Sequence, residues 1–161
     1  MVDTREQIEQ RLSVLIGLDM SGAGCAADML TLQFGPIREM TTKRGTIKHV
    51  GAWALHIQCG WKIERANEVF VDASDFAVSD ESTRATLERV RSLITSHGPF
   101  IVERVAVGDN GNMSISMSGQ LRLLIVTDAA PDEEDWRFFE PGSEGKHFVI
   151  QGGKVDPWSL A

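Results

Sequence analysis

The sequence predicts a single α+β domain over residues 1–161, with a mostly antiparallel, meander-rich sheet of about seven or eight strands covered by two helices. Three observations support this fold class. Apolar residues recur at helical spacing in two segments, shorter segments alternate apolar and polar residues, and turn-forming glycines separate the segments. A chain of 161 residues is also long enough to bury one core.

Both predicted helices have clear start or stop signals. The first covers residues 4–15, where apolar side chains recur every three or four positions behind an N-cap signal. The second covers residues 81–97 and has the same spacing on its buried stripe. Ser79 or Asp80 can cap its beginning, and Gly98-Pro99 ends it.

The first half of the chain also contains segments with the period of a strand. Residues 28–34 alternate as a half-buried strand, and residues 37–45 form a polar hairpin arm or a loop. Residues 52–64 read as one long strand with an apolar face and a polar face, in which Gly60 marks a bulge or bend. Residues 69–71 form a further short strand.

In the second half, the apolar pattern decides the register of a three-stranded meander. A three-residue turn at 109–111 places Val107 opposite Met113, whereas a two-residue turn would place it opposite Ser114. The apolar pairing favours the three-residue turn, and the same reasoning applies at 118–120. Two further strands are expected at 136–139 and 147–150.

The segment GAWALHIQCGW combines tryptophans, a cysteine and a histidine. Within one strand Cys59 lies on the tryptophan face and His56 on the opposite face, so the two cannot form a thiolate–imidazole pair. Cys59 is predicted to be a small buried hydrophobe. His56 and Gln58 belong either to a shallow ligand site or to a hydrogen-bonded structural set, and we favour the second reading.

Two other polar features could contribute to a ligand site. Asp28 shares a face with Leu30, an apolar side chain. It could be a general base whose pKa is perturbed by burial. We favour the alternative that it caps the strand at its exposed beginning. The meander register aligns Arg104, Ser116 and Arg122 across three strands. Two guanidinium groups beside a hydroxyl could hold an anion, while cross-strand pairs with acidic residues are the favoured alternative.

An acidic segment precedes the third tryptophan of the chain. Its spacing does not match a calcium loop, so no metal site is expected there. It could bind a basic partner with the tryptophan as an anchor, or it could be a solvated loop. The residues of this candidate partner-binding surface are Asp132, Glu133, Glu134, Asp135 and Trp136.

Composition limits the partners and the compartment. The net charge of −7 argues against a nucleic-acid or anionic-membrane binder, and no apolar run approaches the length of a membrane span. Two cysteines and the lack of a secretory signal favour the cytoplasm. No phosphate-binding glycine loop or serine elbow is present, so no cofactor is expected.

Two stretches resemble a pattern found in small uncharacterised bacterial proteins. They are ADML at 27–30 followed by Phe34-Gly35, and ALHIQCGWK at 54–62. The resemblance covers roughly residues 1–65 and implies a bacterial source. The family has no established activity, so no catalytic residue is carried over. Similar small acidic cytoplasmic domains occur as immunity proteins beside secreted bacterial toxins.

We therefore expect a cytoplasmic, non-catalytic protein-binding module, in its narrower form an immunity-type inhibitor of a basic toxin. The alternative is a small-ligand-binding protein or a small enzyme. A third reading is a homodimer formed through a sheet edge or face. The site of the alternative would lie near Asp28, His56 and Gln58, or near Arg104 and Arg122.

Overall fold

The computed structural model describes residues 3–128 and 130–160. It contains two α-helices and thirteen strands in antiparallel sheets, which confirms the α+β class. The strands form two sheets and a separate hairpin, whereas the sequence predicted one sheet of about seven or eight strands. The six-stranded sheet has the order β1 (Met20–Ala26), β2 (Met29–Phe34), β5 (Trp53–Ile57), β11 (Glu134–Phe139), β12 (Phe148–Gln151), β13 (Lys154–Val155).

The second sheet and the hairpin come from the remaining strands. In the five-stranded sheet the order is β7 (Glu68–Asp72), β6 (Gly60–Arg65), β10 (Leu121–Val126), β9 (Met113–Met117), β8 (Val102–Val107). The hairpin consists of β3 (Arg38–Thr41) and β4 (Ile47–Val50).

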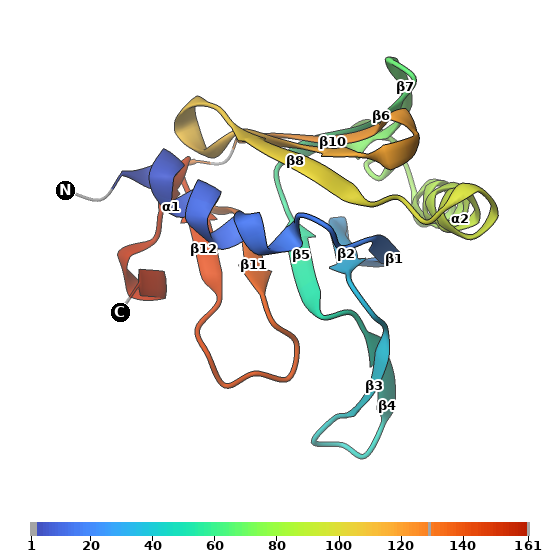
Figure 1. The fold of residues 1–161 in the computed structure, drawn as a ribbon, viewed down its shortest axis with the longest axis horizontal. Helices are drawn as coiled ribbons and strands as arrows, with labels where there is room; N and C mark the ends of the chain where they lie inside the picture. The colour runs from blue at the N-terminus through green and yellow to red at the C-terminus, as the bar shows by residue number, and fades with distance from the viewer. Residues whose placement is uncertain (1–2, 129, 161) are drawn as a thin grey trace.

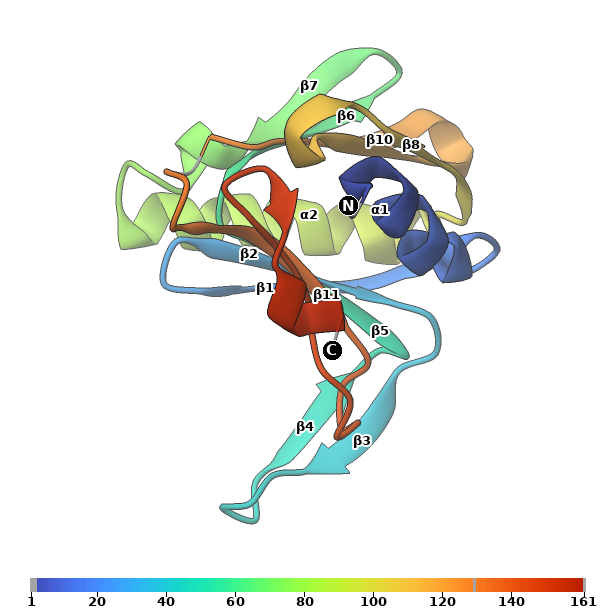
Figure 2. The same cartoon turned by 90° about the vertical axis from the view of Figure 1, so that its left-hand side faces the viewer.

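The core lies between the two sheets, which face each other (Figure 1). Helix α1 (Thr4–Leu12) packs against β8 and β13, and α2 (Asp80–His97) packs against β1. Each helix thus fills a flank of the space between the sheets (Figure 2). The predicted two helices are present, but the apolar face of each sheet is covered mainly by the other sheet.

Both helices occur where the sequence predicts them. The α-helical part of the first ends at Leu12, and a 3-10 turn at Ser13–Leu15 completes the predicted segment. Ser79 is the N-cap of α2, because its side chain accepts a hydrogen bond from the backbone N–H of Ser82 at 3.0 Å. Gly98 follows the last helical residue.

The predicted long strand at 52–64 is interrupted and serves both sheets. The backbone N–H groups of Gln58 and Cys59 donate to the carbonyl oxygen of Asp135, at 2.8 and 3.1 Å. This contact turns the chain out of β5 and into β6, where the apolar side chains Trp61 and Ile63 again face the core. The bend therefore lies just before Gly60 and changes sheets.

The meander has the predicted register. Val107 pairs with Met113, and Met117 pairs with Leu121. Gly111 has a φ of +76°, and a Cβ there would lie 2.8 Å from a side-chain carbon of Ile150. Glycine thus permits both the left-handed turn and the close contact with the facing sheet.

The hairpin β3–β4 projects from the body (Figures 1 and 2). It confirms the hairpin reading of residues 37–45, with Thr41 paired to Ile47 at the distal end. At its base the Arg38 guanidinium donates to the carbonyl oxygen of Pro141 at 2.5 Å. We call residues 37–50 the arm.

Candidate functional site

His56 and Gln58 lie on the outer face of the six-stranded sheet, on the opposite side from Cys59. Cys59 is 6% exposed, which confirms its prediction as a buried hydrophobe. Burial, together with the carboxylates of Asp135 and Asp128, raises the pKa of the Cys59 thiol to about 12. The thiol therefore stays protonated and does not act as a nucleophile at neutral pH.

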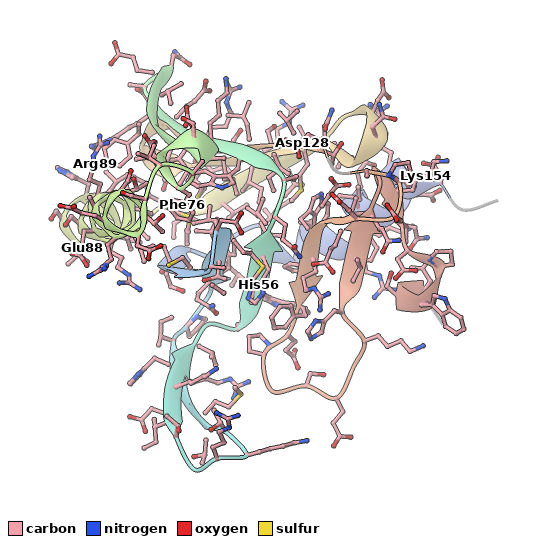
Figure 3. The ribbon with its side chains drawn as sticks, turned by 180° about the vertical axis from the view of Figure 1, so that it is seen from behind. His56, Phe76, Glu88, Arg89, Asp128 and Lys154 are labelled. Carbon is pink, nitrogen blue, oxygen red and sulfur yellow. The ribbon has the colours of Figure 1, made fainter. Side chains whose placement is uncertain are left out.

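The structure surrounds His56 with polar and aromatic groups from β11 and the segment before β12. Arg137 is the cross-strand neighbour of His56, and Phe139 follows two residues later on the same face. His56 is labelled on β5 in Figure 3. The outer-face cluster consists of His56, Gln58, Glu134, Arg137, Phe139 and His147.

Glu134 and Arg137 form the charged centre of this cluster. The Arg137 guanidinium donates to both Glu134 oxygens, through Nε to Oε2 at 2.8 Å and through Nη2 to Oε1. Gln58 Nε2 also donates to Glu134 Oε2 at 2.7 Å, and Arg137 Nη1 lies 3.0 Å from His147 Nδ1. Gln58, Glu134, Arg137 and His147 thus satisfy one another, which supports the hydrogen-bonded structural reading for Gln58. For His56 the contact shown is the ring of Phe139.

Phe139 links the two imidazole rings. It stacks on His147 with ring centroids 3.9 Å apart, and its contact with His56 is edge-on at 4.8 Å. Burial first, and then the Arg137 guanidinium, lower the pKa of His56 and of His147. Both rings are therefore neutral at neutral pH, and a neutral His147 Nδ1 can accept the Arg137 N–H.

These lowered pKa values make stability depend on pH. Between the ordinary histidine pKa of 6.5 and the lower folded values, the unfolded chain binds more protons than the folded chain. The free energy of unfolding is therefore expected to fall as the pH drops from about 7 to about 5. Urea denaturation of the wild type and of a His56→Gln, His147→Gln variant measures this, and the variant should show a smaller fall.

The exposed residues His49 and His97 provide the matched control. A His49→Gln, His97→Gln variant should keep the full pH dependence of the wild type, because both side chains lie outside the outer-face cluster. Identical pH dependence in the wild type and the cluster variant would contradict the prediction.

Asp28 lies outside the face on which sequence parity placed it. It is an exposed residue in the two-residue turn between β1 and β2, where Ala27 has a φ of +54°. The parity argument fails because β2 begins at Met29, so the residue before it is free to turn away. This position matches the favoured reading, at the exposed beginning of a strand, and does not support a buried general base.

The row Arg104, Ser116 and Arg122 has the predicted register across β8, β9 and β10. It lies on the outer face of the five-stranded sheet, and Glu64 on β6 extends it. Arg122 donates to Glu64 Oε1 through Nε at 3.1 Å and through Nη2 at 2.5 Å, and these bonds lower the pKa of Glu64. An anion at this row would have to compete with Glu64 for Arg122, so the geometry supports the reading as a cross-strand pair for Arg122.

The acidic segment does not form one exposed surface. Asp132 and Glu133 are exposed, but Glu134 is paired with Arg137 and Asp135 is fully buried. Trp136 is also fully buried, and its Nε1 donates to the carbonyl oxygen of Gly111 at 3.1 Å. Trp136 cannot anchor a partner from this position, which corrects that part of the prediction.

Sequence reasoning did not find Glu134, Arg137 and His147 as neighbours of His56. The sequence gives no sign of this cluster beyond a polar side chain in an otherwise apolar strand. The neighbours were missed because the pairing of β5 with β11 joins segments that lie far apart in the chain.

Among the described residues no group of three or more His, Cys, Asp or Glu side chains could hold a metal ion. Neither described helix has the length and apolar character of a membrane span. Comparison with known protein families, curated proteins and solved structures finds no match to this chain.

Proposed function

We propose that the protein is a non-catalytic protein-binding module that holds its partner with the arm. The observation that carries this proposal is the projection of β3 and β4 away from both sheets (Figure 1). In the described chain these two strands pair only with each other, and most of their side chains are exposed. A two-stranded ribbon has little stability of its own in water, so contacts with a partner would add to its order.

The arm and the body carry net charges of opposite sign. The arm holds four basic side chains and one acidic side chain, which leaves twelve basic and twenty-two acidic residues elsewhere. A positive projection on a negative body favours an acidic partner surface and disfavours nucleic acid, whose phosphates the body would repel. The charged residues of the arm are Arg38, Glu39, Lys43, Arg44 and Lys48.

Apolar side chains and free strand edges add to the fit. Ile37 is 44% exposed and Ile47 is 58% exposed, so the arm can bury apolar area against a protein. The outer edges of its strands carry unpaired backbone groups that an extended segment of a partner can join. An immunity-type inhibitor of a basic toxin is a different protein-binding function, in which the partner would meet exposed body residues such as Asp132 and Glu133.

The test compares charge reversals on the arm and on the body. A Lys43→Glu, Arg44→Glu, Lys48→Glu variant changes the arm, and a control reverses three exposed basic residues of the body. In pull-downs from cells that carry the gene, a protein retained by the wild type and the control should be lost by the arm variant. The control substitutions are Arg84→Glu, Arg104→Glu and Lys154→Glu.

Each other outcome has a distinct meaning. A partner that the arm variant retains, and that is lost when Asp132 and Glu133 become Asn and Gln, would identify the body as the interface and a basic partner as the target. Recovery of nucleic acid in place of a protein would overturn the proposal. Concentration-dependent sedimentation that the arm variant abolishes would identify the partner as a second copy of this chain.

A further inference from the structure

We propose that α2 and the β6–β7 hairpin form a binding site for a small anion with a flat apolar body, such as an aromatic carboxylate. A cavity of about 380 Å³ lies between these elements. This volume is within the range of small-molecule sites. Its lining includes Arg65, Phe70, Glu88, Arg89, Leu93 and His97.

The floor of the cavity is apolar. Phe70 on β7 is half-buried, and Leu93 on α2 is 4% exposed. The Arg89 guanidinium carbon lies 4.6 Å from the centroid of the Phe70 ring, in a cation–π contact. A flat hydrocarbon can lie on this floor beside a guanidinium that is already held in place.

The two arginines of the cavity are available to an anion. Within the described chain, the guanidinium groups of Arg65 and Arg89 form neither an ion pair nor a hydrogen bond. Glu88, the acidic residue of the lining, lies 3.8 Å from Arg91. A carboxylate can therefore pair with Arg65 and Arg89, and guanidinium–carboxylate bonds are among the stronger hydrogen bonds in proteins.

Further groups would help to orient such a ligand. The hydroxyls of Ser92 and Ser96 line the helix side of the cavity and can donate to a second oxygen. A neighbouring hollow of about 480 Å³ shares Arg65 and Phe70, so the site has room for a larger apolar body. Arg89 and Glu88 lie on α2, away from His56 on β5 (Figure 3), so the site is separate from the outer-face cluster.

The test uses 1-naphthoate as the probe and 1-naphthamide, its neutral counterpart, as the ligand control. In an NMR titration of the ¹⁵N-labelled protein, naphthoate should shift the backbone amide signals of Arg65, Phe70 and Leu93. Naphthamide should bind about tenfold more weakly or less, because it cannot form the charged pair. Equal binding of the two probes, shifts confined to other elements, or no binding of naphthoate would overturn the proposal.

Matched charge variants separate a site from a general attraction of anions. Arg65→Gln and Arg89→Gln should each weaken naphthoate binding about tenfold. Arg104→Gln, which removes an exposed guanidinium from the other side of the same sheet, should leave binding unchanged. Equal weakening by Arg104→Gln would show that net charge alone attracts the probe. Since the arm plays no part, this result is independent of the proposed protein-binding function.

Discussion

Replacing Trp136 with alanine is expected to lower the free energy of unfolding by about 4 kcal/mol. The side chain is fully buried, and its ring lies 6.0 Å from that of Phe148. Its Nε1 also donates to the carbonyl oxygen of Gly111 in the facing half of the molecule. Truncation would open a cavity and leave that buried carbonyl unpaired, and both effects act in the same direction. Urea denaturation followed by circular dichroism measures the loss.

Trp158 supplies the matched control for this experiment. It is 77% exposed near the end of the described chain, so Trp158→Ala should change the free energy of unfolding by no more than about 0.5 kcal/mol. Similar losses for the two variants would mean that Trp136 is not part of the core. The acidic segment would then regain its role as a surface with an aromatic anchor.

Asp135→Ala is expected to cost about 3 kcal/mol, because it removes a charged hydrogen-bond acceptor from a buried position. Asp135 is fully buried, and its Oδ2 accepts the backbone N–H of Gly153 at 2.7 Å. Without the carboxylate, that N–H is left unpaired in the turn between β12 and β13. Asp135→Asn should cost less, since the amide oxygen can still accept the bond.

Two readouts keep the Asp135 prediction specific. Asp132→Ala changes an exposed acidic residue of the same segment and should leave the free energy of unfolding nearly unchanged. In Asp135→Asn, the pKa of Cys59 should fall below its value of about 12, because the Asp135 carboxylate is one of the charges that raise it. The pKa of Cys59 is measured by thiolate absorbance against pH. If it does not change in Asp135→Asn, the Asp135 carboxylate does not raise it, and this part of the prediction is wrong.

The sequence predicts most reliably those features that depend on nearby residues. The meander registers are correct because the turns at 109–111 and 118–120 join strands only a few residues apart. The same locality explains α2, whose cap and end lie within the segment itself. The row of Arg104, Ser116 and Arg122 follows directly from those registers.

Features that depend on distant contacts were not predictable in this way. Strand β1 has the sequence MSGAGCA, without apolar alternation, and is held by pairing with β2 and by contact with α2. One such contact is the hydrogen bond from Arg91 Nε to the Ala23 carbonyl oxygen at 2.9 Å. The bend at Gln58 depends in the same way on Asp135, far along the chain. The burial of Trp136 follows its pairing with Ile57, whereas the acidic residues before it suggested an exposed loop.

The pairing of β5 with β11 also has a consequence for folding during synthesis. Ile57 pairs with Trp136, about eighty residues later, while all strands of the five-stranded sheet lie between them in the chain. At ordinary elongation rates a ribosome needs roughly 4–16 s to add eighty residues. During that interval the nascent chain has an open edge on β5 and no cover over part of its apolar interior. The longer this interval lasts, the more the nascent chain is expected to aggregate or to need a chaperone. A slowly translated segment after β10 would lengthen the time during which the β5 edge is unpaired.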